Sequence, residues 1–173
     1  MFPFFNRQKK QLQKIKLLLV DVDGVLTDGS IWMADSGELV KPFNVKDGYA
    51  IVYARKHGLE VGIITGRTSQ SLAKRAQDLH ITELHQGIHD KLVVFQQILE
   101  KKQLTAQQVA YMGDDIPDIP VLKNVSYSTA PYDASVEVKK IVQYVSPYKG
   151  GQGAVRDVIE RILQTQNNWP PKI

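Results

Sequence analysis

The sequence of 173 residues contains no cysteine, which excludes disulfide bonds, thiolate zinc sites and cysteine nucleophiles. It also lacks any apolar run close to the roughly 20 residues that span a bilayer. The apolar stretch behind the basic N-terminus, Leu17 to Val20, is too short for the core of a signal peptide. We therefore predict a cytoplasmic protein that does not enter a membrane.

Repeats and low-complexity segments are absent as well, and the length is that of one domain. We predict a basic N-terminal segment at residues 1–14, a single domain at 15–166 and a loose polar tail at 167–173. The net charge is +4, and basic residues gather early in the chain. No aromatic residues interleave with this basic cluster, so a solvated helix face is favoured over a nucleic-acid arm. A mildly basic chain also suits a small anionic substrate.

Short apolar runs alternate with amphipathic stretches along most of the chain. Such runs predict buried parallel strands, and the stretches between them predict helices. The alternation predicts an α/β fold, a Rossmann-like parallel sheet with helices on both faces. We expect strands at residues 15–22, 60–65, 81–84, 109–112, 125–128 and 144–145, and helices near 47–57, 69–79, 90–102, 117–123, 134–140 and 153–165.

Residues 30–43 interrupt this alternation. Two short apolar stretches flank the turn sequence at residues 35–37, which predicts a small β-hairpin insertion in place of a cap domain. Trp32 and Tyr49 are expected to pack in the hairpin core or at an interface. The hairpin has too little surrounding domain to bury its apolar side chains, so we expect burial between subunits.

Polar residues follow four of the predicted strands at the point where each ends. The carboxyl ends of parallel strands share one edge of a sheet, so these residues are expected to converge there. Each has a structural alternative, such as a turn or a helix cap, but turn chemistry does not explain four groups in this order. They are Asp21 and Asp23, Thr65 with Gly66 and Arg67, Lys91, and Asp114, Asp115 and Asp118.

The combination fits phosphoryl transfer. Carboxylates repel a phosphate unless a hard cation lies between them, and Mg²⁺ prefers oxygen ligands. We expect carboxylate ligands from Asp21 and Asp114 and a backbone carbonyl from Asp23. Asp21 would attack phosphorus to form an aspartyl-phosphate, while Asp23 would protonate the leaving oxygen and then activate water. Thr65 and Lys91 would hold the phosphoryl oxygens.

The motifs D-x-D-G-V-L-T at 21–27, T-G-R at 65–67, Lys91 and G-D-D-x-x-D at 113–118 resemble those of the haloacid dehalogenase superfamily. The strings LLLVDVDGVLTDG, FNVKDGYAI, IITGR, YMGDDIPD and GGQGAVRDV are similar to its capless branch of 3-deoxy-D-manno-octulosonate 8-phosphate phosphatases. The resemblance implies Mg²⁺, a role in lipopolysaccharide precursor synthesis and a homotetramer in which a neighbour covers each active site. It also places the hairpin and the C-terminal tail at interfaces.

The resemblance further implies a substrate-binding set. Forked guanidinium groups at Arg67 and Arg75 suit a substrate that carries both a phosphate and a carboxylate, although each arginine could be a surface residue. Free amides at Asp47-Gly48, where a helix is expected to open, suit an anion, and a plain helix cap is the alternative. The glycine-rich stretch at 150–153 is either a linker or a segment that reaches a neighbour's site, and Gln152 stands where a basic residue is usual. The full substrate-binding set is Asp23, Asn44, Val45, Lys46, Asp47, Gly48, Arg67, Arg75 and Lys91, with Thr27, Gly66, Asp115 and Asp118 in support.

Three other functions share part of the pattern. A signalling receiver domain carries its acidic pair before the acceptor aspartate, whereas Asp114-Asp115 comes last here, and it lacks an acid two residues after the acceptor. A sugar phosphomutase usually needs a cap, for which residues 29–46 are too few. A phosphatase of a nine-carbon sialic-type sugar acid phosphate carries the same motifs and stays open as an alternative.

Overall fold

The structure, a computed structural model, describes residues 3–33, 35, 37 and 39–170. Six parallel strands form one sheet in the order β5-β4-β1-β6-β7-β8. This order runs outward from β1 in both directions, as in Rossmann-type sheets, so the α/β prediction is confirmed. The strands are β1 (Leu17–Val20), β4 (Glu60–Ile64), β5 (Leu84–His85), β6 (Val109–Met112), β7 (Tyr127–Ala130) and β8 (Tyr144–Val145).

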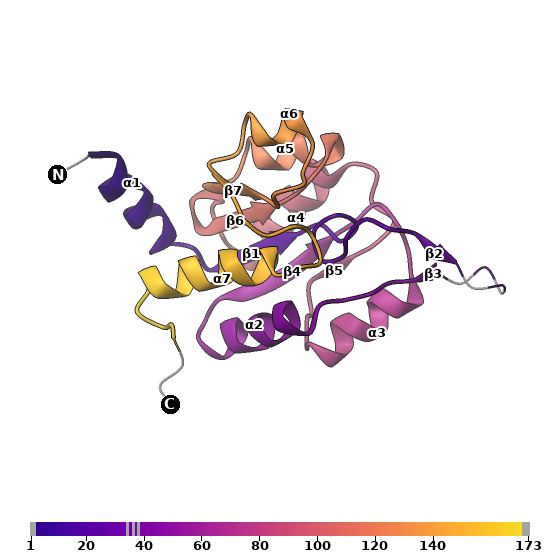
Figure 1. Cartoon of the computed structure of the whole chain (residues 1–173). Coiled ribbons are helices and arrows are strands. Elements are labelled where there is room, and N and C mark those ends of the chain that lie inside the picture. The colour runs from indigo at the N-terminus through magenta and orange to yellow at the C-terminus, as the bar shows by residue number, and fades with distance from the viewer. Residues whose placement is uncertain (1–2, 34, 36, 38, 171–173) are drawn as a thin grey trace.

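Helices lie on both faces of this sheet (Figure 1). They are α1 (Pro3–Leu12), α2 (Val45–Lys56), α3 (Gln70–Asp78), α4 (Lys91–Lys102), α5 (Ile119–Leu122), α6 (Val136–Lys139) and α7 (Ala154–Thr165). The apolar faces of α2, α3 and α7 line one core, and those of α4, α5 and α6 line the other. Two 3-10 turns, Ala106–Gln108 and Ile116–Asp118, flank β6.

Strand β1 contributes to both cores because its side chains alternate between the faces of the sheet. Leu18 and Val20 join the core beneath α2 and α7, whereas Leu17 and Leu19 join the core beneath α4. All four side chains are fully buried. Burial of each contributes roughly 1.5–3 kcal/mol, which fixes the strand that carries the first aspartate motif.

The register of the central strands aligns their carboxyl ends. Val20 of β1 pairs with Ile63 of β4 on one side and with Met112 of β6 on the other. The chain therefore leaves the sheet at Asp21 and just after Met112 along the same edge, and Thr65 directly follows β4. This alignment is the structural basis of the site.

Three strands begin later than predicted. β1 starts at Leu17 rather than at residue 15, β5 at Leu84 rather than at 81, and β7 at Tyr127 rather than at 125. Ile15 and Ile81 are buried without belonging to a strand. An apolar run indicates burial but does not by itself distinguish a strand from a buried connection, which explains these shifts.

The hairpin is present as β2 (Trp32–Met33) and β3 (Leu39–Val40), which pair antiparallel. It extends beyond the sheet beside α3 (Figure 1). Residue 36 of the predicted turn, and residues 34 and 38 on either side of that turn, lie outside the described residues. Within this single chain the Trp32 side chain is 60% exposed and Tyr49 is 53% exposed, so neither is packed in a hairpin core.

The end of α1 and the residues after α7 are docked on the domain. Gln166, just after α7, donates hydrogen bonds to the carbonyls of Leu12 and Ile15. Residues 167–170 fold back on α2, where Trp169 meets Tyr53 edge-on with ring centroids 5.0 Å apart. The Trp169 ring covers apolar surface of the domain there, and the loose tail predicted for residues 167–173 stays a prediction. Residues 171–173 of that tail lie outside the described part of the chain.

None of the helices in the described residues is long and apolar enough to cross a membrane.

Candidate active site

The first aspartate of the D-x-D motif lies at the end of β1 in contact with a buried lysine. The Asp21 side chain is nearly buried, and its Oδ1 lies 2.9 Å from Nζ of Lys91. Lys91 is the first residue of α4, a helix that Asp90 caps through the N–H groups of its first turn. Thr65, also buried, follows the adjacent strand β4. The structure thus brings three of the predicted catalytic residues to one edge of the sheet.

A second buried carboxylate, Asp118, organises the loop after β6. Its Oδ1 accepts hydrogen bonds from Lys91 Nζ at 2.7 Å and from the Tyr111 hydroxyl at 2.6 Å. Its Oδ2 accepts the N–H groups of Asp114 at 3.0 Å and Asp115 at 3.3 Å. Asp118 therefore fixes both the lysine and the backbone that presents Asp114. The exposed Asp115 begins the 3-10 turn and takes part in its cap.

Crowding of carboxylates changes the acidity of the site. Burial, followed by the charge of Asp118, raises the pKa of Asp21 to about 6, although Lys91 opposes the shift. Burial, followed by the charges of Asp21, Asp118 and Asp115, raises the pKa of Asp114 to about 8. Burial lowers the pKa of Lys91, but the charges of Asp21 and Asp118 outweigh it and the net pKa is raised. One ammonium group does not balance these carboxylates, so the site favours a further cation.

The donor atoms fit a hard cation. Carboxylate oxygens of Asp21, Asp114 and Asp118 lie within 4.8 Å of one another. Those of Asp118 are committed to hydrogen bonds, whereas Oδ1 of Asp114 is buried and has no hydrogen-bond partner among the described residues. A Cβ at Gly24 would lie 2.1 Å from Oδ2 of Asp114, so only glycine admits this approach. An all-oxygen donor set of this kind suits Mg²⁺.

The second aspartate of the motif is held by different partners. The Asp23 side chain is 23% exposed, and its Oδ1 contacts Nζ of Lys41 while its Oδ2 lies 3.8 Å from Nε of Arg67. Lys41, which directly follows β3, belongs to none of the sequence motifs. Its only local signal is a basic residue between an apolar strand and Pro42, and that pattern does not reveal a partner 18 positions away.

The glycine-rich stretch near residue 150 packs on the loop of its own active site. The N–H of Gly151 donates to the carbonyl of Val25 at 2.9 Å. A Cβ at Gly150 would lie 1.9 Å from the carbonyl oxygen of Gly24 and 2.9 Å from that of Thr27. The buried Thr27 is thus part of a tight contact between two loops. In this chain, Gly150 and Gly151 are therefore a packed contact rather than a free linker.

The predicted 44–48 segment divides into an outer and an inner part. Asn44 caps α2 by accepting the Lys46 N–H at 2.8 Å, and its Nδ2 donates to the Gly151 carbonyl at 3.0 Å. Asn44, Val45 and Lys46 border an open groove of about 520 Å³ that also includes Gly151. Asp47 instead is buried and accepts the Arg156 N–H of α7 at 2.8 Å. The cap expected at Asp47 is therefore supplied by Asn44, because the Asp47 carboxylate serves another helix.

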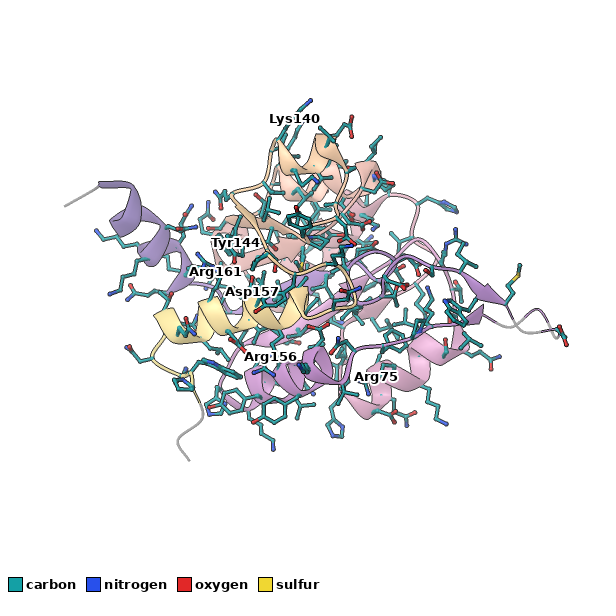
Figure 2. All side chains as sticks on the ribbon, viewed as in Figure 1. Arg75, Lys140, Tyr144, Arg156, Asp157 and Arg161 are labelled. Atoms are coloured by element: carbon teal, nitrogen blue, oxygen red, sulfur yellow. The ribbon has the colours of Figure 1, made fainter. Side chains whose placement is uncertain are left out.

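Arg75 belongs to α3, and its side chain reaches toward Gly48 at the start of α2 (Figure 2). A Cβ at Gly48 would lie 2.2 Å from Nη2 of Arg75, so the glycine makes room for the guanidinium group. Nε of Arg75 is buried and has no hydrogen-bond partner in the described part of the chain. Arg67, by contrast, is exposed at the mouth of the site beside Asp23, next to the exposed Gly66.

Comparisons with known proteins agree with this geometry. The family model described as haloacid dehalogenase-like hydrolase matches residues 80–159. The 3-deoxy-D-manno-octulosonate 8-phosphate phosphatase of Yersinia pestis is 46% identical over 153 residues, which cover 88% of this chain and 82% of that protein. A crystal structure of the Yersinia pestis phosphatase matches with a TM-score of 0.92 and 44% identity over 94% of this chain and 88% of that chain. The Moraxella catarrhalis phosphatase, solved with magnesium, phosphate and a KDO molecule, matches with a TM-score of 0.91 and 34% identity over 94% of each chain.

Proposed function

Because the chain belongs to the 3-deoxy-D-manno-octulosonate 8-phosphate phosphatases among the haloacid dehalogenase-like hydrolases, we propose that it hydrolyses this eight-carbon sugar acid phosphate. Hydrolysis of phosphoric monoesters is the activity of the family. The observation that carries the proposal is the buried Asp21–Lys91 pair at the end of β1, with Asp23 two residues away. The names of the relatives support the substrate, and with it a step in lipopolysaccharide precursor synthesis. We also propose that the protein is cytoplasmic, as the sequence predicts.

In the proposed reaction, Asp21 and Asp23 divide the chemistry. An Asp21 carboxylate oxygen attacks phosphorus as the bond to the sugar oxygen breaks, and Asp23 gives that oxygen a proton. Asp23 then takes a proton from water, which attacks phosphorus and releases phosphate from Asp21. Lys91, 2.9 Å from the Asp21 carboxylate, orients it and offers positive charge to the phosphoryl oxygens, which the Thr65 hydroxyl also holds.

Mg²⁺ is the cofactor we propose for this site. Carboxylate oxygens of Asp21 and Asp114 and the backbone carbonyl of Asp23 would hold it. When bound, it would offset the negative charge between the nucleophile and the phosphoryl group. The buried, unpaired Oδ1 of Asp114 supports this assignment.

The first experiment compares phosphate release from the eight-carbon and nine-carbon sugar acid phosphates with Mg²⁺. We expect the eight-carbon compound to be preferred, EDTA to silence the enzyme and Mg²⁺ to restore it. Asp21→Asn should lower turnover by at least about 10³-fold without unfolding the protein, whereas Asp78→Asn on the surface of α3 serves as the matched control. Near-normal turnover of Asp21→Asn would contradict the nucleophile assignment, and preference for the nine-carbon compound would reverse the substrate.

We also propose that the chain forms a homotetramer in which neighbours cover the active sites. The groove bordered by Asn44, Val45 and Lys46 is open on one side of this single chain, which supports such a cover. Val45 is 80% exposed at that border. In the proposed tetramer, the hairpin and the C-terminal tail lie at the interfaces between subunits.

A further inference from the structure

We propose that Lys41, at the end of the β2–β3 hairpin, is a positioning residue that holds the carboxylate of Asp23 for its two proton transfers. The inference rests on the proposed function, because it requires Asp23 to act as acid and base. It adds a residue to the site that the motifs do not contain. It also gives the hairpin a task inside its own chain's active site, separate from any contact with a neighbour.

Burial is the first reason. Only 6% of the Lys41 side chain is exposed, whereas lysine is among the residues that are almost never fully buried without a partner. Burial of an ammonium group is strongly unfavourable unless the group is paired and hydrogen-bonded. Its contact is the Oδ1 of Asp23. The contact with Asp23 therefore compensates for the burial of the Lys41 ammonium group.

The second reason is that the two carboxylate oxygens of Asp23 have different surroundings. Oδ1 is occupied by Lys41, whereas Oδ2 faces Arg67 at 3.8 Å, beyond hydrogen-bond distance. In the described part of the chain, the side-chain contacts of Asp23 come from these two cations. One oxygen is thus anchored and the other remains available to the leaving oxygen or to water. An error of about 1 Å in the position of a catalytic group can cost about 10²-fold in rate, so an anchor of this kind matters.

The third reason is the rigidity of the element that carries the lysine. β3 pairs with β2 through Trp32 opposite Val40, and β3 also lies against α3 (Figure 1). Pro42 follows directly, and a residue before proline is restricted to extended conformations. The strand pairing before Lys41 and the proline after it therefore restrict the backbone that directs its side chain toward Asp23.

The test compares Lys41→Met with Lys41→Arg, and uses Lys56→Met on the exposed end of α2 as the matched control. Initial rates are measured with the eight-carbon sugar acid phosphate and with p-nitrophenyl phosphate at saturating Mg²⁺. Lys41→Met should lower kcat by about 10²-fold and leave KM and the Mg²⁺ concentration for half-maximal activity nearly unchanged. Lys41→Arg should recover most of kcat. The loss should be smaller with p-nitrophenyl phosphate, whose leaving group needs little protonation.

A double-mutant cycle with Asp23→Asn separates positioning from general structural damage. If Lys41 acts through Asp23, Lys41→Met should have almost no further effect on kcat in the Asp23→Asn background. Independent, additive losses would overturn the inference, as would a Lys41→Met variant that raises only KM or keeps full kcat. Full activity of Asp23→Asn would contradict the proposed function itself, whereas an impaired Asp23→Asn beside a fully active Lys41→Met would contradict only the role of Lys41.

Discussion

Asp118 shows how much a single residue can organise without touching the reacting atoms. Its two oxygens bind the Lys91 ammonium group, the Tyr111 hydroxyl and two backbone N–H groups. Burial, followed by the charge of Asp118, raises the pKa of Tyr111 well above its usual value, so the phenol stays a donor. Lys91, the partner of Asp21, and the loop of Asp114 therefore depend on the same carboxylate.

Removal of this carboxylate should destabilise the protein strongly. We expect Asp118→Ala to lower the free energy of unfolding by about 3 kcal/mol, because it leaves the buried Lys91 with one partner fewer and two N–H groups unpaired. Urea denaturation measures the change, with Asp78→Ala on the exposed end of α3 as control. A difference below about 1 kcal/mol between the two variants would show that the Asp118 network adds little.

Glu83, away from the active site, gives a prediction for pH. Burial alone would raise its pKa, but hydrogen bonds from His85, Lys101 and Lys102 outweigh burial and the net pKa is lowered. A carboxylate with a lowered folded-state pKa contributes stability that is present above its unfolded pKa, near 4.5, and is lost as the pH falls through the folded value. The contribution of Glu83 is therefore full at neutral pH.

Glu83→Gln should lower the free energy of unfolding by about 2 kcal/mol at pH 7, since hydrogen bonds to a charged group are lost. The gap from wild type should close as the pH drops below 4.5, the usual value for the carboxyl group. Denaturation series at several pH values measure this, with the exposed Glu100→Gln of α4 as control. A gap that stays constant down to acid pH would mean that packing, not charge, is responsible.

At the scale of elements, α7 begins without a cap of its own. Its N-cap residue is Gly153, which has no side chain to offer, and Asp47 of α2 accepts the N–H of Arg156 instead. A side chain more than 100 positions away in the sequence thus caps the N-terminus of α7. The same helix packs along α2, so one carboxylate ties two neighbouring helices together at their N-terminal ends.

This arrangement predicts different effects for two substitutions of Asp47. Burial raises the pKa of the Asp47 carboxyl group. The stability that its protonated form contributes is therefore present at low pH and is lost as the pH rises through the folded-state pKa. At neutral pH the buried charge destabilises the folded state. Asp47→Asn keeps an accepting oxygen without the charge and should change the free energy of unfolding by less than about 0.5 kcal/mol. Asp47→Ala should lower it by about 2 kcal/mol through loss of the cap, as measured by thermal unfolding. Equal losses in both variants would refute the capping role.

A second link between elements joins β8 to α7 (Figure 2). The Tyr144 hydroxyl donates to Oδ2 of Asp157 at 2.8 Å, and the Arg161 guanidinium lies 4.0 Å from the centre of the Tyr144 ring. Because the glycine-rich stretch lies between β8 and α7, these contacts fix both of its ends. Gly150 in this stretch packs against the loop that contains Gly24 and Thr27, so the contacts of Tyr144 also support that loop.

At the scale of the whole molecule, the sequence predicted what depends on local pattern. Apolar runs followed by polar residues located the edge where Asp21, Thr65 and Lys91 meet, because parallel strands place their carboxyl ends together. Contacts between distant segments were not predictable in this way. The pairing of Lys41 with Asp23 depends on the tilt of a hairpin, and the docking of Trp169 depends on a surface formed by several helices. No periodicity in the chain encodes either of them.

The hairpin leads to a prediction about assembly. Ile31, Trp32, Met33 and Val40 are each more than half exposed in the single chain. Several large apolar side chains exposed on one small hairpin favour an interaction site, so, in line with the proposed homotetramer, we expect sedimentation velocity to show a tetramer. Met33→Glu should dissociate it by placing a charge in the interface, whereas Val93→Glu on α4 should leave the assembly intact. The dissociated variant should keep its fold but lose activity on the sugar acid phosphate, because a neighbour no longer covers the groove. A wild-type chain that sediments as a stable, fully active monomer would contradict both the tetramer and the shared active site.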